Sequence, residues 1–349
     1  MNQNDYNHVL NHMRLVDGNI WPIPICLDIS LQFAENIKLG QEIALRNAEG
    51  ILLAVLEIND IWKIDKHKEA EAIYATKEIN HPGVAYLNDH VQEFYIAGNL
   101  FAVFFPQYYD FTDLRHTPIE LKKIFEQLNW KKIIGFQTRN PMHKAHQALT
   151  LEAVAQIGGN LLIHPVVGPT KSGDIDYPVR VKCYQYIMQT YPLGLAMLSL
   201  LPLAMRMAGP REALWHAIIR KNYGCTHFII GRDHAGPGNN QSGQPYYDVH
   251  AAQQLTMQFK NEIGIEIIPF QEMVYSAKQD RYYFTNQFPA DEVPATISGT
   301  ELRKHLHHNL DIPEWFSYPA IIKELRYAYP AKSCQGFTIF FTGLPSSGK

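Results

Sequence analysis

Residues 133–146 read IIGFQTRNPMHKAH, and this stretch decides how the rest of the chain is interpreted. The apolar run 133–136 predicts a buried strand. Asn140 suits a helix N-cap and Pro141 a first helical residue, so we expect a helix from Pro141 to about Ile157. A strand, a short polar loop and a helix N-terminus thus follow one another. Such a loop directs backbone N–H groups and the positive end of a helix dipole at a ligand, which predicts an anion site.

The side chains of this loop favour the same interpretation. Arg139 supplies a planar cation that suits an oxyanion, and Gln137 and Thr138 add neutral donors. His143 and His146 are three residues apart and would share one face of the expected helix. Two such histidines could also be surface residues or half of a metal site, but the loop has no nearby Cys or acidic residue to complete that site. We therefore favour a polyanion site and expect no metal held by the protein.

The ten residues from Gln137 to His146 resemble the signature loop of the ATP sulfurylase family, which belongs to the H-x-x-H nucleotidyltransferases. The string is more specific than H-x-x-H alone, and the resemblance extends over about residues 1–330. It implies a reaction in which a sulfate oxygen attacks the α-phosphorus of ATP and yields adenylyl sulfate and pyrophosphate. Magnesium (Mg2+) would be carried by ATP on its β- and γ-phosphates, with few protein ligands.

The composition limits the other classes of function. A chain of 349 residues with 46% hydrophobic and 19% charged residues is typical of a soluble globular protein of two or three domains. A net charge of −3 offers no basic footprint for nucleic acid, and neither a secretory signal nor a membrane span is expected. Cys26, Cys183, Cys225 and Cys334 are scattered without a C-x-x-C pair, which favours the cytoplasm. Relatives in the resembled family also suggest a homo-oligomer.

Residues 1–128 have a mostly β texture. Short apolar runs at 21–29, 43–45, 51–58 and 94–96 are separated by turns, with one helical stretch near 66–76. Asn47 to Gly50 is expected to join two runs as a hairpin. This segment resembles the PUA-like β-barrel domain that opens ATP sulfurylases. The string His81 to Val84 matches that domain, although a simple Pro-Gly turn explains it equally well.

From residue 129 strands and helices alternate, which predicts an α/β fold with a parallel sheet. The expected strands lie at 133–136, 161–163, 195–201, 227–230 and 265–268. We expect a Rossmann-like H-x-x-H nucleotidyltransferase domain at 129–288 and a small, mostly helical subdomain at 289–332. Ligands bind at the carboxyl ends of strands in such sheets, so the loops that follow these strands should form the site.

Three later loops have the composition that this expectation requires. The loop after the second strand, residues 164–175, contains the cation Lys171, and the loop after the third strand covers 205–213. Residues 231–238 read GRDHAGPG, and their glycines allow a backbone to approach a ligand closely. Asp233 could accept from a ribose hydroxyl or hold a hydrated magnesium ion. All three loops also match the family.

The resemblance assigns roles residue by residue. Sulfate would be held by Gln137, Arg139 and the backbone N–H of Ala235. Thr138, Arg139 and Asn140 would form the catalytic loop, with His143 and His146 facing the triphosphate. Besides these five and Gln137, the ATP-contacting set would be Gly231, Arg232, Asp233, His234, Val274 and Arg303. For Arg303 a purely structural explanation is sufficient, because Ser298 and Glu301 have the spacing of a capping box at the start of its helix.

The tail reads GLPSSGK at residues 343–349, after an apolar run at 337–342 that predicts a strand. This is a P-loop, G-x-x-x-x-G-K, without its final Ser or Thr. It resembles the opening of adenylylsulfate kinase, which some organisms carry fused behind the sulfurylase. Residues 333–349 are therefore expected to be the truncated start of a kinase domain in a longer bifunctional protein.

Two other functions stay open at this point. One is a different H-x-x-H adenylyltransferase, for example of pantetheine phosphate or nicotinamide mononucleotide; such chains are usually shorter and lack both the QTRNP string and the β-module. The other is a nucleotide or anion sensor that kept the fold without catalysis.

Overall fold

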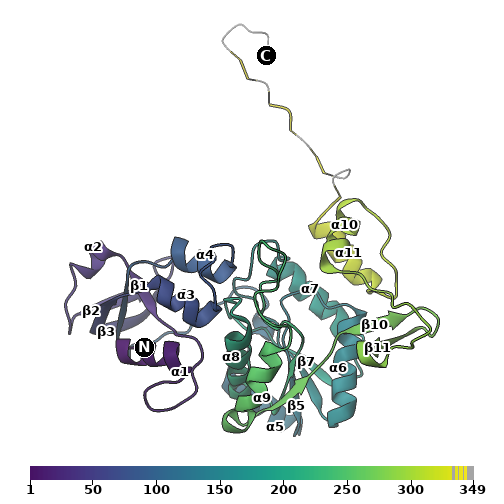
Figure 1. Ribbon diagram of the computed structural model, residues 1–349, viewed down its shortest axis with the longest axis horizontal. Helices are drawn as coiled ribbons and strands as arrows, with labels where there is room; N and C mark the ends of the chain where they lie inside the picture. The colour runs from purple at the N-terminus through teal and green to yellow at the C-terminus, as the bar shows by residue number, and fades with distance from the viewer. Residues whose placement is uncertain (332–334, 337, 341, 344–349) are drawn as a thin grey trace. The chain divides into compact units, whose positions relative to one another are not determined.

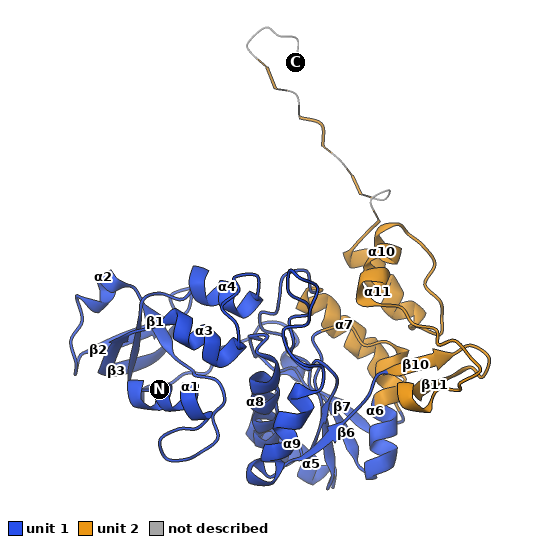
Figure 2. Cartoon of the chain, in the orientation of Figure 1, with its two compact units in different colours: residues 1–139, 150–174, 192–272 blue, residues 140–149, 175–191, 273–349 orange. Residues whose placement is uncertain are grey.

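The computed structural model describes residues 1–331, 335–336, 338–340 and 342–343. The chain divides into two compact units (Figure 2). The first unit contains residues 1–139, 150–174 and 192–272, and the second contains residues 140–149, 175–191 and 273–349. The boundaries at 128, 288 and 332 that the sequence suggested stay predictions.

The first unit opens with an antiparallel sheet whose strand order is β1-β4-β3-β2 (Figure 1). Its strands are β1 (Leu27–Ile29), β2 (Glu42–Arg46), β3 (Leu52–Lys63) and β4 (Phe94–Phe101). The predicted hairpin is confirmed, because β2 pairs with β3 and the Asn47 N–H donates to the Ile51 carbonyl at 3.0 Å. The expected β-barrel is present as an open four-stranded sheet, in which β1 and β2 are the edge strands.

This part of the chain is also more helical than predicted. It has four helices, α1 (Gln3–His12), α2 (Leu31–Ala34), α3 (Lys66–Tyr74) and α4 (Pro82–Asp89), where the sequence indicated only α3. Each begins after a side chain that caps the helix, namely Asn2, Ser30, Asp65 or His81. His81 accepts a hydrogen bond from the Gly83 N–H at 3.1 Å, and Pro82 is the first helical residue. The Pro-Gly pair is therefore a helix start and not a turn.

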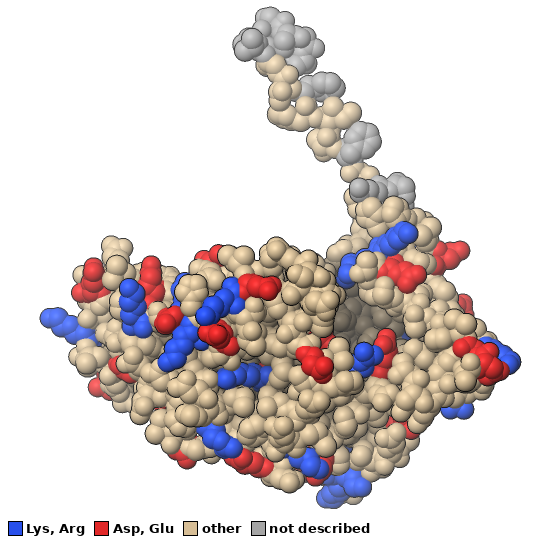
Figure 3. All heavy atoms as spheres, in the orientation of Figure 1, with Lys and Arg blue, Asp and Glu red and all other residues tan. Residues whose placement is uncertain are grey.

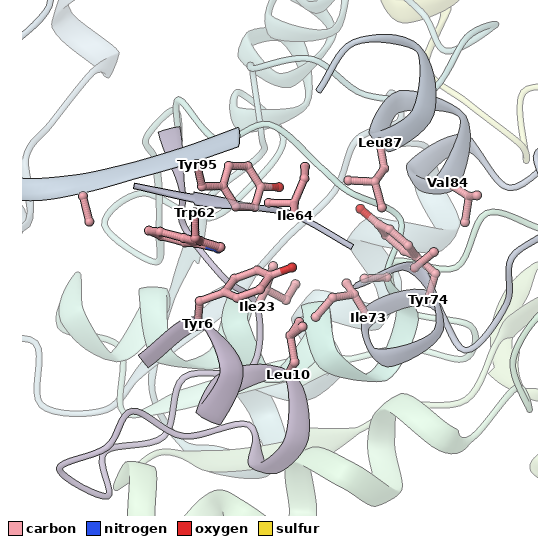
Figure 4. Close-up of a cluster of buried hydrophobic side chains, with 13 residues drawn as sticks. Tyr6, Leu10, Ile23, Trp62, Ile64, Ile73, Tyr74, Val84, Leu87 and Tyr95 are labelled. Carbon is pink, nitrogen blue, oxygen red and sulfur yellow. The ribbon is translucent and has the colours of Figure 1, made fainter. Parts of the chain in front are cut away.

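The core of this region packs α1, α3 and α4 against the sheet (Figure 4). Tyr6 lies edge-on to Tyr95, with ring centroids 5.6 Å apart. Inside the cluster the Glu69 carboxylate is 2% exposed and accepts from the Tyr6 hydroxyl at 2.8 Å and the Tyr95 hydroxyl at 3.0 Å. Burial raises the pKa of Glu69. A Cβ at Gly83 would lie 2.6 Å from the Arg206 carbonyl oxygen, so this glycine permits a close backbone contact with the loop before α8.

A parallel five-stranded sheet follows, with the order β7-β6-β5-β8-β9. Its strands are β5 (Ile133–Phe136), β6 (Asn160–Ile163), β7 (Ala196–Leu198), β8 (His227–Ile230) and β9 (Glu266–Pro269). All five predicted strands are confirmed, although β7 is shorter than expected and Leu193 before it is fully exposed. The strand order reverses between β5 and β8, and this is the point where such sheets bind ligands.

The helices beside this sheet are α5 (Pro118–Gln127), α6 (Lys144–Ile157), α8 (Gly209–Asn222) and α9 (Ala251–Ile263), with the short η1 (Thr112–Leu114) before α5. Leu121 and Phe125 of α5 and Ala213 and Ala217 of α8 are buried in one cluster with Phe228 of β8. This apolar layer supports the strand ends from which the site loops leave.

Besides the first residues of α6, the described part of the second unit contains a hairpin, one short 3-10 helix and three α-helices. These are β10 (Met273–Ser276), β11 (Arg281–Phe284), η2 (Thr285–Gln287), α7 (Tyr177–Met188), α10 (Gly299–His307) and α11 (Pro319–Ala328). Lys182 of α7 forms a 2.8 Å salt bridge with Glu324 of α11. The predicted capping box is confirmed, since Ser298 and Glu301 make both reciprocal bonds at the start of α10.

The strand predicted at 337–342 falls partly outside the described residues. Residues 338–340 and 342 have no regular structure, while Phe337 and Phe341 lie outside the described residues. The P-loop prediction also falls mostly outside them, at 344–349. None of the described helices is long and apolar enough to cross a membrane. On the face drawn in Figure 3, basic and acidic side chains are interspersed.

Candidate functional site

Loops from three neighbouring strands meet at the carboxyl edge of the parallel sheet. Gly135 of β5 lies opposite Leu162 of β6 and Phe228 of β8, so the loops that leave these strands start side by side. Burial raises the pKa of Asp233 in the loop after β8, and the positive charges of Arg139 and Lys171 oppose that rise. Those cations belong to the loops after β5 and β6. Arg139 and Lys171 thus act on the charge of Asp233, and the Lys171 ammonium donates to the Pro237 carbonyl of the same loop at 3.1 Å.

Arg139 has an acidic partner that the sequence did not reveal. Its Nη1 donates to both carboxylate oxygens of Asp174, at 2.5 and 2.6 Å. The two side chains are 18% and 8% exposed, so this ion pair is largely withdrawn from water. Nε and Nη2 of Arg139 make no hydrogen bond within the described residues and can still bind an oxyanion. The only signal for Asp174 was its place in a long loop after a parallel strand.

Gln137 and Thr138 are held close to the sheet. The Gln137 amide nitrogen lies 3.8 Å from the sulfur of Met205, which belongs to the loop after β7. Thr138 is 8% exposed, and its carbonyl accepts from the Val166 N–H at 3.2 Å. The start of the anion loop is thus braced by the loops that follow β6 and β7.

The GRDHAGPG loop has a backbone that few side chains tolerate. Asp233 and Ala235 have φ values of 47° and 57°, in the left-handed region. A Cβ at Gly236 would lie 1.8 Å from the Asp233 carboxylate, so any larger residue there would displace the Asp233 side chain. The Ala235 carbonyl accepts from the Gly209 N–H at 3.1 Å, while the Ala235 N–H has no hydrogen bond within the described part of the chain. That N–H is available to an anion.

The other residues of this loop differ in orientation. Arg232 is exposed and lies 3.6 Å from Glu272 in a surface ion pair. The His234 Nε2 lies 3.0 Å from Nδ1 of His216, and its ring packs edge-on to Phe228. The imidazole of His234 therefore faces the protein interior, and any contact of this residue with a nucleotide would come from its backbone.

In the second unit, the helix that carries His143 and His146 begins later than predicted. It starts at Lys144, so the expectation of Asn140 as N-cap and Pro141 as first helical residue is wrong. The Asn140 carbonyl instead accepts from the Tyr184 hydroxyl at 2.8 Å. The His143 carbonyl accepts the first α-helical bond from the Gln147 N–H at 3.2 Å, and also accepts from the His146 N–H at 3.0 Å, which makes His143 the N-cap.

The two histidines are neutral donors in this arrangement. Burial lowers the pKa of His143 to about 3, with a further contribution from His146, and burial lowers the pKa of His146 to about 4. The His146 Nδ1 accepts from the His143 N–H at 3.1 Å, so its ring proton is on Nε2. The His143 Nδ1 lies 2.8 Å from the Ser317 hydroxyl. His146 can thus donate Nε2–H to a phosphate without being protonated.

Val274 and Arg303 also belong to the second unit. Val274 is 5% exposed in β10 and pairs with Tyr283 of β11. Arg303 is exposed on α10 and donates to the Thr300 hydroxyl at 3.1 Å. Their roles toward ATP stay predictions. Within the described residues, no three His, Cys, Asp or Glu side chains cluster in a way that could hold a metal ion.

The buried histidines predict a loss of stability in mild acid. Burial lowers the pKa of His81 to about 4, as it does for His146, and that of His143 to about 3. The unfolded chain takes up these protons below about pH 6.5, whereas the folded chain does not until about pH 4 or 3. Stability should therefore be complete above pH 6.5 and fall by up to ~1.4 kcal/mol per pH unit for each histidine below it. The raised pKa of Glu69 acts in the opposite direction.

Urea unfolding at pH 7, 6 and 5 measures this effect. His146→Gln should reduce the pH dependence of the free energy of unfolding by the contribution of one histidine. A free energy of unfolding that is constant from pH 7 to 5 would contradict the assignment of these histidines as neutral in the folded state.

Two family models match the chain. A PUA-like domain matches residues 1–104 and an ATP-sulfurylase domain matches residues 112–328. Among curated relatives, the chain is 51% identical over 357 residues to a sulfate adenylyltransferase of Mycosarcoma maydis, and 49% identical over 352 residues to one of Yarrowia lipolytica. Each alignment covers 100% of this chain and 61% of the relative, so the chain spans less than two thirds of the length of these relatives.

One solved structure is similar to this chain over almost its whole length. The hexameric APS kinase from Thiobacillus denitrificans aligns with a TM-score of 0.79 at 30% sequence identity. The alignment covers 99% of this chain and 61% of that one.

Proposed function

Because the chain belongs to the ATP-sulfurylase family, we propose that it is the part of a sulfate adenylyltransferase that converts MgATP and sulfate to adenylyl sulfate and pyrophosphate. The observation that carries this proposal is the placement of Arg139 beside the loop of Asp233 and Ala235, where the strand order of the sheet reverses. Arg139 belongs to the string 137–146, and Asp233 and Ala235 belong to the string 231–238. The family resemblance rests on both strings.

The chemistry needs oriented charge more than proton transfer. Sulfate is already a dianion at neutral pH, so its oxygen can attack without a general base. A bond forms between that oxygen and the α-phosphorus, and the bond from the α-phosphorus to the oxygen bridging to the β-phosphorus breaks. Pyrophosphate leaves, and no covalent enzyme intermediate forms. The barrier lies in bringing a dianion against a polyphosphate, which preorganised donors and cations lower.

The residues present fit these tasks. Gln137, the free edge of the Arg139 guanidinium and the Ala235 N–H would hold sulfate. Thr138 and Asn140 complete the catalytic loop, and His143 and His146 would donate to the α-phosphate and the leaving pyrophosphate. The adenosine would contact residues 231–234, mainly through the backbone, and Val274, while Arg303 would approach the triphosphate. Mg2+ enters as part of the substrate MgATP, and Asp233 is an oxygen donor suited to one of its water ligands.

A sulfate-dependent ATP–pyrophosphate exchange assay tests the proposal. Radiolabelled pyrophosphate should enter ATP only when sulfate is present. Exchange that needs another acceptor, such as a nucleotide or pantetheine phosphate, would support a different adenylyltransferase. ATP binding without exchange for any acceptor would support a nucleotide sensor.

The ion pair of Arg139 with Asp174 leads to a prediction. The Asp174 carboxylate pairs with the Arg139 guanidinium that would bind sulfate. The carboxylate and the sulfate dianion therefore repel one another at this site. Asp174→Asn should lower the sulfate KM by about 10-fold, because removal of a repulsive interaction of ~1.4 kcal/mol changes affinity by that factor. Initial rates at varied sulfate measure it. A higher sulfate KM would show instead that Asp174 is needed to orient Arg139.

We also propose that the longer protein carries an adenylylsulfate kinase after this region. Two observations support the proposal: the chain spans 61% of the length of its relatives, and its last seven residues match the start of a P-loop. The kinase would phosphorylate the 3′-hydroxyl of adenylyl sulfate and so remove the product of an unfavourable equilibrium. The protein extended past Lys349 should form the 3′-phosphorylated product from ATP and adenylyl sulfate, and residues 1–349 should not. Product from residues 1–349, or none from a folded longer protein, would overturn this proposal.

We also propose that the protein is a homo-oligomer and that it is located in the cytoplasm. A homo-oligomer is supported by the hexameric description of the structurally similar APS kinase. A cytoplasmic location is supported by the free thiols of Cys26, Cys183 and Cys225; Cys334 lies outside the described residues.

A further inference from the structure

A chain of buried hydrogen-bonding groups ends at the loop that carries Ala235. The Glu212 carboxylate on α8 is 1% exposed and accepts from the Arg206 N–H at 2.9 Å and the Ala208 N–H at 3.0 Å. One turn later on α8, Nε2 of His216 lies 3.4 Å from that carboxylate. Nδ1 of His216 then lies 3.0 Å from Nε2 of His234. His216 is fully buried and its Nε2 has no hydrogen-bond partner within the described residues, so its 3.4 Å contact with Glu212 is electrostatic.

The charge at one end sets the proton positions along this chain. Burial tends to raise the pKa of Glu212, but the contacts with His216 and the two backbone N–H groups outweigh it, and the pKa lies below its ordinary value. The carboxylate is therefore ionised and only accepts. His216 must then carry its proton on Nε2, which leaves Nδ1 as an acceptor. His234 can satisfy that acceptor only with its proton on Nε2.

Glu212 reaches the same loop by a second route. Its bonds to Arg206 and Ala208 hold the turn before α8, and the N–H of Gly209, the next residue, donates to the Ala235 carbonyl at 3.1 Å. The loop is thus attached at the His234 side chain and at the Ala235 carbonyl. Both Asp233 and Ala235 have positive φ, a conformation that needs such external support.

We propose that Glu212 and His216 are positioning residues that hold the His234 Nε2–H tautomer and thereby aim the Ala235 N–H at the anion. The proposal rests on the proposed function, in which that N–H binds sulfate. Neither residue touches the substrate. Their effect on the reaction passes through the backbone of residues 233–235.

Three variants test the network. Glu212→Gln removes the charge and, with its oxygen toward Arg206 and His216, turns its NH2 onto the Ala208 N–H, so it should disturb the turn before α8 without changing the tautomer of His216. His216→Leu removes the link, whereas His216→Gln restores one donor and one acceptor and should rescue part of the loss. Glu69→Gln is the matched control, because Glu69 is an equally buried carboxylate that contacts Tyr6 and Tyr95 in a different core.

Two readouts on the whole chain decide the outcome. Nitrogen-15 NMR of the imidazoles should show the Nε2–H form of His234 in the wild type and in Glu212→Gln, and the loss of that single form in His216→Leu, which removes the acceptor of this proton. The sulfate KM from exchange kinetics should rise by about 10-fold or more in Glu212→Gln and His216→Leu, less in His216→Gln, and stay unchanged in Glu69→Gln. An unchanged tautomer in His216→Leu, or a loss that appears only in the melting temperature and equally in Glu69→Gln, would overturn the proposal. If the wild type shows no sulfate-dependent exchange, the proposed function fails, while the tautomer measurement still decides whether His216 controls the tautomer of His234.

Discussion

Arg139→Ala is expected to abolish measurable adenylyl sulfate formation. The guanidinium of Arg139 is the cation of the anion loop, and its Nε and Nη2 have no other hydrogen bond within the described residues. Loss of one preorganised donor to developing charge typically costs on the order of 10²–10³ in rate, and a charged donor should cost at least as much. Exchange kinetics at saturating MgATP and sulfate measure the loss.

The fold should survive this change, but Asp174 would be left largely buried without its cation. For that reason Arg139→Ala should be combined with Asp174→Asn in a second variant, which removes the unpaired charge and should still be inactive. Arg115→Ala is a matched control, because Arg115 also pairs with a carboxylate, that of Asp110, at 2.7 Å, and it is not assigned to the site. Activity of Arg139→Ala within a few-fold of the wild type would refute the assignment of this loop to sulfate.

His146→Gln is expected to lower kcat by about 100-fold while the KM for ATP changes by only a few-fold. The Nε2–H of His146 would meet charge that grows on the α-phosphate and pyrophosphate during the reaction, so its loss acts mainly on the transition state. Glutamine is the informative replacement, since His146 is the third residue of α6 and glutamine at that position can accept from the His143 N–H as in a capping box. The helix start is then preserved, and only the donor is removed.

His8→Gln provides the comparison for this variant. His8 is also a helical histidine whose Nδ1 meets a backbone group, the Arg14 carbonyl at 2.9 Å, and it has no assigned role. It should leave kcat within a few-fold. A large rise in the KM for ATP without a change in kcat would indicate that His146 binds substrate and transition state equally. Loss of a stoichiometric bound transition metal on substitution would support the metal-site alternative.

Much of the parallel sheet and its loops could be predicted from the sequence. The strands β5, β6, β8 and β9 are short runs of buried apolar residues, and their positions follow from local patterning alone. The capping box of α10 is equally local, because Ser298 and Glu301 bond to the backbone within one turn. Polar loops after parallel strands must lie at one edge of the sheet, so the meeting of Arg139 with Asp233 was predictable as soon as the sheet was.

What only the tertiary structure decided depends on partners distant in sequence. Helix α6 starts at Lys144 and not at the predicted Pro141. The Asn140 carbonyl, which a helix starting at Pro141 would have used, accepts from the hydroxyl of Tyr184, 44 residues away. Asp174 is 35 residues from Arg139, and the network from Glu212 through His216 to His234 joins α8 to the loop after β8. No periodicity or spacing encodes these contacts, because each depends on the folded positions of two separate elements. The sequence by itself therefore determined which loops bear the charged groups, and the tertiary structure decided which proton and which backbone N–H each loop presents.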